Sequence, residues 1–521
     1  MSPILRQLYV AASPQLAAIS AGGLIGYPSV LLQQFKSNDS SIHADVHTAS
    51  WIASVHGLAG VPSLFIPYLM QLRGRKFGFQ TCCFLVTLGW TIIYFARNAA
   101  TIIIGESFQG LGAKSLLVVS YMTISEMVHP KYRNILMLFY SINQSVGVTL
   151  AHSMGRFFHW KTVSLILALP TIIAFLMSCS WPESPAWLAY KGRLDECKKS
   201  FIWLRGLNEE SVSEMNALLK AHTEIKDRTL KSQKKSLKDF WAQITSKDFY
   251  LPSFHMLVLL SVYYCSGNLV FLVYAMNMIE NVTKDENSAF IGMIIMDCVT
   301  VVGNSIAYIF FKYFNNKPVL LTSGVGSAVF LLASSIVSYL QFSNRLSSDS
   351  LLCLYLLVGF MIASSLGIYT TPYVMAAEIM PVRHRGAGGA LMVIIICASY
   401  SFTLKIAPFL VLYLKLHGTF LLYTVTLSLC LFWVWRFVPE TKNKTLQCIE
   451  ESYVDKSVLE VKPQKDEVNE VDKLNVRLVL IAKPEETNEI VHTVIPNEVI
   501  QTLLENEEKS IDVVTTIERG S

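Results

Sequence analysis

Charged side chains are scarce in this chain, in which Asp, Glu, Lys and Arg make up only 16% of the 521 residues. Hydrophobic residues make up 52%, and the mean hydropathy is +0.42. Soluble globular domains carry roughly 25% charged residues. The composition therefore excludes an ordinary soluble protein of this length and indicates an integral membrane protein.

Several chemical signatures are also missing. The ten cysteines lie mostly in or beside apolar segments and suggest neither a disulfide framework nor a zinc site. The polar segments contain no nucleophile and base pairing, no Gly-rich phosphate loop and no metal-ligand cluster. The net charge of +5 is modest, and its basic residues are explained by membrane orientation. The sequence thus predicts no enzyme, no cofactor, no metal and no nucleic-acid partner.

Long apolar segments are what the chain has in abundance. Nine charge-free segments are near or above the roughly 20 residues that a helix needs to span a bilayer. They cover residues 7–35, 46–72, 77–96, 134–155, 162–182, 251–279, 318–344, 350–377 and 416–435. Three further segments, 99–120, 288–311 and 386–413, carry interior charges. Twelve spans are predicted, the first of them too long for a signal peptide.

Two features occur twice, about 250 residues apart. The motif PESPAWL (182–188) follows the sixth apolar segment, and PETKNKTL (439–446) follows the twelfth. An acid seven residues before an arginine is also repeated, as Glu126 with Arg133 and as Glu378 with Arg385. Such duplication is typical of a transporter built from two parallel repeats. The predicted fold class is an all-α membrane protein with two pseudo-symmetric six-helix bundles.

The predicted organisation has four parts. They are an N-terminal bundle (1–182), a cytosolic loop with short helices (183–250), a C-terminal bundle (251–438) and a mostly disordered cytosolic tail (439–521). Basic residues gather in every second loop between the predicted spans, and these loops share one side of the membrane. This distribution predicts that this side and both termini are cytosolic. The sequons at Asn38 and Asn281 then fall outside, as glycosylation sites of a multi-pass cell-membrane protein. A cytosolic partner for the tail is left open.

Charged motifs follow one another at the predicted helix ends. They are Gly74-Arg75-Lys76, the two acid and arginine pairs, PESPAWL and PETKNKTL. This set covers about residues 10–450 and resembles the sugar porter family of the major facilitator superfamily. Residues 26–32 and 50–54 look most like those of the insect facilitated trehalose transporters. The resemblance implies the major facilitator fold and a small-molecule sugar as substrate.

The resemblance also implies a cytosolic latch of charged residues, which would hold the two bundles together in one state and separate in another. Its members are Arg75, Lys76, Glu126, Arg133, Glu183, Glu378, Arg385 and Glu440. Removing one partner of a desolvated ion pair is costly enough to bias a two-state equilibrium. The second copy of the Arg75 loop, residues 312–317, has lost its acid, its glycine and one arginine, which weakens the expected latch. The alternative is that these charges only anchor helix ends at the membrane surface.

Midplane positions for the solute also follow from the resemblance. They are Ser141, Gln144, Tyr263, Tyr264, Asn268, Thr300, Tyr373 and Tyr400. Tyr263 and Tyr264 stand where the family has glutamines, so amide groups are replaced by rings that stack and donate one hydrogen bond. Packing within the bundle is an equally good interpretation of each tyrosine.

Charged residues inside spans are the remaining candidates, since charge is costly at membrane depth. Glu106 and Asp297 are candidates for intramembrane coupling, and Lys114 and Lys405 also lie in spans. Proton-coupled members of the family have an acid where this chain has Pro28, which favours uniport. The sequence predicts a facilitative transporter of trehalose or a hexose that works by alternating access. A proton-coupled or non-sugar carrier and a non-transporting nutrient sensor that signals through the tail remain alternatives.

Overall fold

The computed structural model describes residues 2–36, 42, 45–207, 215, 247–283, 285–347, 351–380 and 385–442. The chain divides into two units, residues 1–455 and 456–521, and every described residue belongs to the first. Asn38, most of the loop after residue 207 and the predicted tail beyond Lys442 lie outside the described residues. All regular elements in the described ranges are helices, which confirms the predicted all-α class.

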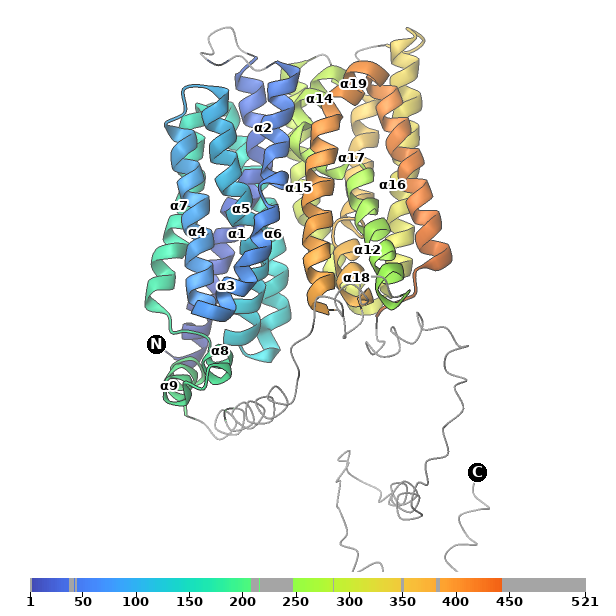
Figure 1. The fold of residues 1–521 in the computed structure, drawn as a ribbon. Coiled ribbons are helices and arrows are strands. Elements are labelled where there is room, and N and C mark those ends of the chain that lie inside the picture. Colours follow the sequence, from blue (N-terminus) through green and yellow to red (C-terminus); the bar gives the residue numbers. More distant parts are fainter. Residues whose placement is uncertain are drawn as a thin grey trace, which may run out of the picture. The chain divides into compact units, whose positions relative to one another are not determined.

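The first half of the chain builds one bundle (Figure 1). Its elements are α1 (Pro3–Gln34), α2 (Val46–Leu58), η1 (Val61–Phe65), α3 (Ile66–Arg73), α4 (Arg75–Tyr94), α5 (Ala99–Met127), α6 (Pro130–Phe157) and α7 (Trp160–Ser180). Helix α1 packs on α6 and α7, and α4 packs on α5 and α7. In the core the rings of Tyr27 and Trp90 meet edge to face with centroids 5.0 Å apart. Such aromatic pairs add to the apolar burial that holds helices together.

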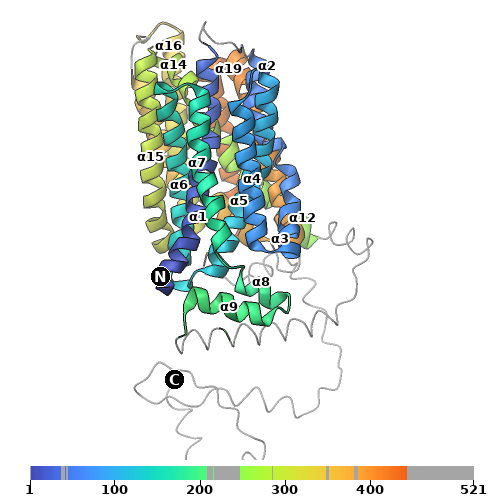
Figure 2. The ribbon, with the colours of Figure 1, turned by 90° about the vertical axis from the view of Figure 1, so that its left-hand side faces the viewer.

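Two short helices, α8 (Pro185–Tyr190) and α9 (Leu194–Arg205), follow the first bundle. The Ser184 hydroxyl accepts the Trp187 N–H at 3.3 Å and so caps α8 within the PESPAWL motif. Helix α9 buries Cys197, Phe201 and Leu204 on one face, as its helical spacing predicts. Figure 2 shows α9 lying across the helix ends. This side of the molecule is called the α9 end below, and the side where α1 ends and α2 begins is the opposite end.

The second half builds the other bundle. Its elements are α12 (Lys247–Cys265), α13 (Asn268–Val273), α14 (Ala275–Thr283), α15 (Glu286–Tyr313), α16 (Asn316–Phe342), α17 (Leu352–Ser365), α18 (Thr371–Ile379) and α19 (Arg385–Phe437). Helix α16 packs on α17 and α19, and α12 also packs on α19. The backbone of α19 is non-helical at Lys415, with φ 58°, between the two last predicted spans. The helices of this bundle run from Lys247 to Phe437, and the predicted boundaries at residues 251 and 438 stay a prediction.

Breaks in the helices occur where the two bundles face each other. Gly267 separates α12 from α13 with φ +82°, a left-handed conformation that glycine adopts without strain. Residues 366–370 separate α17 from α18. The bundles meet along two main seams, α2 against α19 and α6 against α15, and α1 also contacts α13 and α14. Interrupted helices of this kind are typical of substrate sites in transporters.

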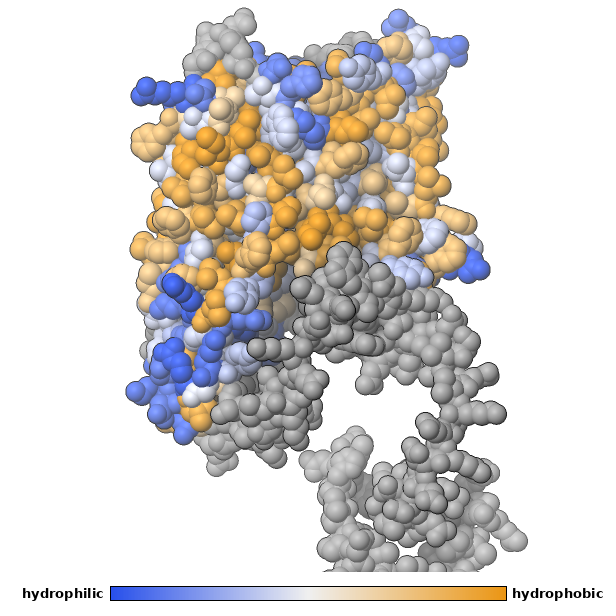
Figure 3. All heavy atoms as spheres, viewed as in Figure 1, coloured by the Kyte–Doolittle hydropathy of each residue, from blue (hydrophilic) through white to orange (hydrophobic). Residues whose placement is uncertain are grey.

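The outer surface is apolar along the length of the helices. Leu176, Val329 and Leu429 are each at least 60% exposed. Figure 3 shows such residues forming a hydrophobic band between hydrophilic ends. Nine helices of the described chain are long and apolar enough to cross a membrane. The protein is therefore a multi-pass membrane protein, while the count of twelve spans stays a prediction.

Candidate functional site

The latch contacts of the first half are centred on Arg75, the first residue of α4, and they lie within the first bundle, whereas the expected latch joins the two bundles. The Arg75 guanidinium donates to both carboxylate oxygens of Glu126 at 2.9 to 3.1 Å, and Ser184 also donates to that carboxylate. Both charged side chains are largely buried, with 13% and 17% of their surface exposed. Charge-assisted, forked hydrogen bonds of this type are the strong ones. They fix the start of α4 against the end of α5 and the cap of α8.

Glu183 completes the same latch from the loop after α7. Its carboxylate accepts the backbone N–H of Arg75 at 2.9 Å and that of Lys76 at 3.2 Å. Burial raises the pKa of Glu183 above its ordinary value, although these N–H groups and the Arg75 charge oppose the rise. The Lys76 ammonium donates to the carbonyls of Cys179 and Trp181 at 2.8 and 3.0 Å. The PESPAWL motif therefore holds the loop between α3 and α4 in place.

Arg133 lies apart from this ion pair. Its Nε–H donates to the Val128 carbonyl at 2.9 Å, across the turn between α5 and α6. The repeated spacing of acid and arginine thus does not join Glu126 and Arg133 by a hydrogen bond or ion pair in the described part of the chain. Arg385 begins α19, and its side chain lies outside the described residues.

The second half repeats the latch with weaker chemistry. The Asn316 amide donates to Glu378 and to the Thr441 hydroxyl, both at 3.3 Å. Glu440 accepts the backbone N–H of Lys317 at 3.0 Å. Asn316, Lys317, Glu378 and Glu440 thus occupy the places that Arg75, Lys76, Glu126 and Glu183 have in the first half. A neutral amide replaces the guanidinium, as the loss of arginine from this loop predicts.

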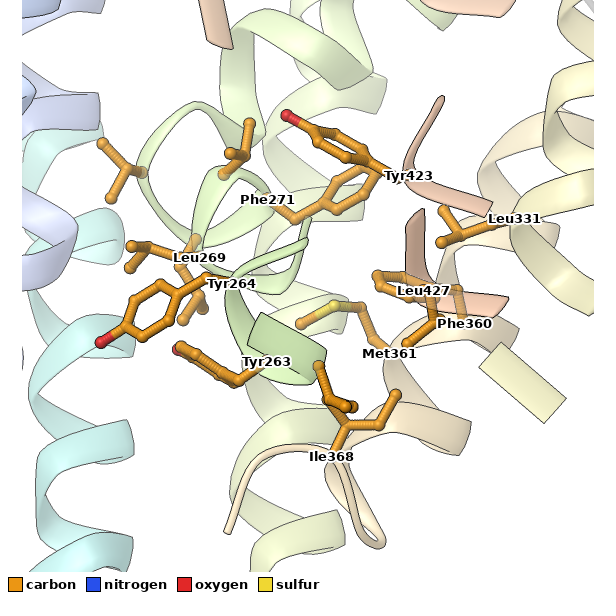
Figure 4. Packing of buried hydrophobic residues seen from close by; sticks show 14 of the residues in the cluster. Tyr263, Tyr264, Leu269, Phe271, Leu331, Phe360, Met361, Ile368, Tyr423 and Leu427 are labelled. Carbon is orange, nitrogen blue, oxygen red and sulfur yellow. The ribbon is translucent and has the colours of Figure 1, made fainter. Parts of the chain in front are cut away.

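Tyrosines gather where the interrupted helices meet. The ring centroid of Tyr263 lies 5.0 Å from Tyr264, 5.6 Å from Tyr369 and 5.5 Å from Tyr373. The Tyr373 hydroxyl donates to the Tyr264 hydroxyl at 3.1 Å. Figure 4 shows Tyr263 and Tyr264 pointing away from the apolar interior around Phe360. We call these four residues the tyrosine cluster. It offers aromatic faces and hydroxyl groups in one place.

Polar groups from both bundles adjoin the tyrosine cluster. The Asn304 amide on α15 donates to the Ser145 hydroxyl on α6 at 3.0 Å, and Tyr369 interacts with Ser145 and Tyr263. Sequence reasoning missed Ser145 and Asn304. Each lies four residues after a predicted position, Ser141 or Thr300, so the next helical turn was the signal that could have found them.

Three of the other predicted midplane residues have local partners. Thr300 donates to the Met296 carbonyl within its own helix at 2.8 Å. The Ser141 and Tyr121 hydroxyls lie 3.4 Å apart, and Gln144 is partly buried on α6. The buried Asn268 amide donates to Ser266 at 2.9 Å, while its Oδ1 has no hydrogen-bond partner in the described part of the chain. Asn268 is therefore the one of these four whose acceptor is both buried and without a partner in the described residues.

Glu106 lies inside the first bundle, fully buried on α5. Its Oε2 is 3.7 Å from Nδ1 of His56 on α2, and Gln109 is fully buried one turn away. Among the described residues the Glu106 carboxylate, His56 Nδ1 and the Gln109 amide have no hydrogen-bond partner. Unpartnered polar groups at this depth are costly. The arrangement can bind water or exchange a proton.

Tyr400 connects this region to the second bundle. Its ring centroid lies 5.6 Å from that of His56 and 3.9 Å from the Lys114 ammonium. Both neighbours belong to the first bundle, whereas Tyr400 lies on α19. The residue predicted as a solute contact thus lies in the seam between α2 and α19.

Asp297 has a partner that sequence reasoning missed. Its carboxylate Oδ2 lies 2.7 Å from Nδ1 of His152, and both side chains are at most 3% exposed. Asp297 is on α15 and His152 is on α6, so the pair joins the bundles. No spacing rule relates two residues 145 positions apart in sequence. The only signal in the sequence was Asp297 itself, because an isolated carboxylate in a membrane span is energetically costly and so indicates a partner.

A cavity of about 310 Å³ lies between the bundles near the opposite end. Its walls are mostly apolar, with polar contributions from Lys36, Asn277 and Asn281. None of the predicted midplane residues lines it. The exposed Asn281 amide donates to the Asn277 carbonyl at 2.8 Å. Glycosylation of Asn281 stays a prediction, and a glycan there would stand beside this cavity.

Comparison with known proteins supplies a family match. The family described as Sugar (and other) transporter matches residues 8–453. The facilitated trehalose transporter Tret1 of Apis mellifera ligustica is 24% identical over 453 residues, which cover 86% of this chain and 88% of that protein. Tret1 of Bombyx mori is 28% identical over 459 residues, 85% of this chain and 86% of that protein.

A plant relative and a solved structure agree with that match. Sugar transporter ERD6-like 2 of Arabidopsis thaliana is 26% identical over 428 residues, covering 78% of this chain and 86% of that protein. The inward open conformation of the xylose transporter XylE from E. coli matches with a TM-score of 0.69 at 16% identity, over 85% of this chain and 99% of the other. At this identity the structural likeness establishes the fold alone.

Proposed function

The chain belongs to the family of sugar (and other) transporters, and from this premise we propose that it carries a sugar of the trehalose or hexose class down its concentration gradient. The family match over residues 8–453 is the observation that carries the proposal. Relatives named trehalose transporters, similar over 85% or more of this chain, support the choice of sugar. Members of this family are transporters, so we expect movement of a solute without bond chemistry.

The tyrosine cluster is the proposed solute site. A sugar exchanges its hydrogen bonds to water for bonds to protein, and its apolar face packs on aromatic rings. Tyr264 and Tyr373 supply the hydroxyls, while Asn304 and Ser145 supply polar groups across the interface. The unpartnered Oδ1 of Asn268 is a further acceptor for a sugar hydroxyl. Together these groups offer a sugar both hydrogen-bonding partners and aromatic faces where the two bundles meet.

Alternating access requires the two bundles to move as bodies around that site. The latch in each half supports such movement, because Arg75 and Asn316 tie helix ends within their own bundle. We propose that the α9 end faces the cytosol with both termini and that the protein resides in the cell membrane. The basic residues at Arg75, Lys76 and Arg193 near the α9 end support this orientation.

Saturable uptake of radiolabelled trehalose or glucose into proteoliposomes tests the function and its site together. We expect uptake that an imposed pH gradient does not change. Tyr373→Phe should raise KM about three- to tenfold with little change in the maximal rate, because one net hydrogen bond contributes about 0.5–1.5 kcal/mol. Tyr423→Phe is the matched control, since the buried Tyr423 hydroxyl has no partner in the described residues.

Three outcomes of this assay would contradict the proposal in different ways. Gradient-driven accumulation would indicate a proton-coupled carrier, for which the buried Glu106 beside His56 is the candidate site. Binding of sugar without uptake would indicate a sensor. Normal uptake by Tyr373→Phe, with an unchanged KM, would remove the tyrosine cluster from the solute site.

A further inference from the structure

We propose that His152 and Asp297 form a buried lock that holds the bundles together at the opposite end of the molecule. The His152 Nδ1 and Asp297 Oδ2 atoms are 2.7 Å apart, with 0% and 3% of the side chains exposed. The two residues come from different bundles. Any movement that separates α6 from α15 must break this contact.

Burial makes the contact decisive for the state of the protein. In the joined state the pair is shielded from water, so its hydrogen bond is stronger than one exposed to solvent, and separation exchanges it for contacts with the water that enters. His152 has no second partner in the described chain, because its Nε2 is buried and makes no hydrogen bond there. Tyr369 lies near enough to Asp297 to interact electrostatically, but its hydroxyl already interacts with Tyr263 and Ser145. The pair therefore stabilises the joined state selectively.

Neighbouring contacts along the same seam differ in strength. Asn304 and Ser145 join α15 to α6 nearer the middle of the bundles, at 3.0 Å. At the opposite end Arg156 pairs with Glu286, but their side chains are 32% and 57% exposed. Exposed ion pairs contribute little because water and salt screen them. The buried pair lies between these contacts and is the only one of the three that joins two titratable groups away from solvent.

The second seam is held by reciprocal cation and aromatic contacts. The Lys405 ammonium of the second bundle lies 3.8 Å from the Trp51 ring centroid of the first and donates to Ser50 at 2.8 Å. The Lys114 ammonium of the first bundle lies 3.9 Å from the Tyr400 ring of the second. Each bundle thus places a lysine on an aromatic ring of the other. Such contacts hold the second seam together with the hydrogen bond from the Ser401 hydroxyl to the Ser54 carbonyl at 2.9 Å.

His152 and Asp297 thus set the conformational equilibrium of the proposed transporter, and the lock rests on that proposed function only for its transport consequence. If the lock controls opening, its loss raises the fraction of protein that is open at the opposite end. Ala407 is a suitable reporter position, because it lines the cavity near that end and is 1% exposed in the joined state. A cysteine there becomes reachable when the bundles separate.

The test measures the rate at which a membrane-impermeant maleimide labels Ala407→Cys in full-length protein in proteoliposomes. Native cysteines are accounted for by subtracting the labelling of the protein without the added cysteine. We expect at least tenfold faster labelling in Asp297→Ala and in the double variant His152→Ala with Asp297→Ala, because alanine removes the contact and adds no large apolar side chain across the seam. The double variant matters because replacing both partners by apolar groups leaves no buried charge unpaired and preserves folding. Arg156→Gln, at the exposed pair of the same seam, should change the rate less than twofold.

The outcomes separate a lock from a merely structural pair. A double variant that elutes as a single folded species and is labelled at the parental rate would overturn the proposal. Equal acceleration by Arg156→Gln would also overturn it, because the effect would then not depend on the buried pair. Labelling needs no sugar, so a failed lock and a failed sugar assignment give distinguishable results.

Discussion

Glu126→Gln is expected to lower the free energy of unfolding by about 2 kcal/mol, because hydrogen bonds to charged groups contribute about 1.5–3 kcal/mol. Arg75 loses the charged half of a forked contact at 2.9 to 3.1 Å, and Ser184 loses its charged acceptor. Since this contact fixes the end of α5 against α4, transport should slow at least tenfold. Thermal unfolding in detergent and initial uptake rates measure the two effects.

Glu378→Gln is the matched control in the other half. Its partner is the neutral Asn316 amide at 3.3 Å, so we expect a loss of less than about 1 kcal/mol. Asn316→Arg should stabilise the protein when Glu378 is present and have no such benefit in the Glu378→Gln background. Equal losses from Glu126→Gln and Glu378→Gln would contradict the assignment of unequal latches.

Gly22→Ala is expected to destabilise the first bundle by about 3 kcal/mol, at the upper end of the usual cost of overpacking. A Cβ at Gly22 would lie 1.8 Å from the Gln144 carbonyl oxygen on α6. The reciprocal contact on the same helix pair places a Cβ at Gly147 only 2.0 Å from the Ile19 carbonyl oxygen. Backbone atoms cannot move aside as a side chain can, so α1 and α6 must separate. Loss of folded protein on expression and a lowered melting temperature would show this.

Gly326→Ala provides the comparison, because the nearest atom to its Cβ would be the Ala363 Cβ at an ordinary 3.5 Å. The substitution should leave melting temperature and transport unchanged. A Gly22→Ala protein as stable as Gly326→Ala would show that α1 and α6 do not pack as closely as the structure has them. Close helix approach through small residues is a general feature of membrane bundles.

The charged contacts at the helix ends could be predicted from the sequence, because the residues that make them belong to short continuous motifs at the membrane surface. Glu183 and Glu440 lie in the two copies of one motif, and each accepts a backbone N–H from the corresponding loop. The role of Asn316 was harder to predict, because its loop lacks the glycine and arginine that mark the Arg75 loop. Its place became clear only from the contact with Glu378.

Midplane residues could be predicted only in part, for a different physical reason. The tyrosines at 263, 264 and 373 do gather, yet Tyr369 joins them only because the chain is interrupted between α17 and α18. His152 could not be predicted from sequence periodicity, because a single polar residue in an apolar span is compatible with a packing role and with a functional role. Its pairing with Asp297 depends on which faces of α6 and α15 meet, and that is a property of the packed bundles.

Counterflow in proteoliposomes tests the central claim most directly, because it requires a site that faces the two sides in turn. Vesicles loaded with unlabelled trehalose or glucose are diluted into a trace of the labelled sugar with no ion gradient present. The account predicts a transient accumulation of label above its external concentration, unaffected by a proton ionophore. Label that only rises to equality, with no transient excess, would contradict an alternating-access sugar carrier.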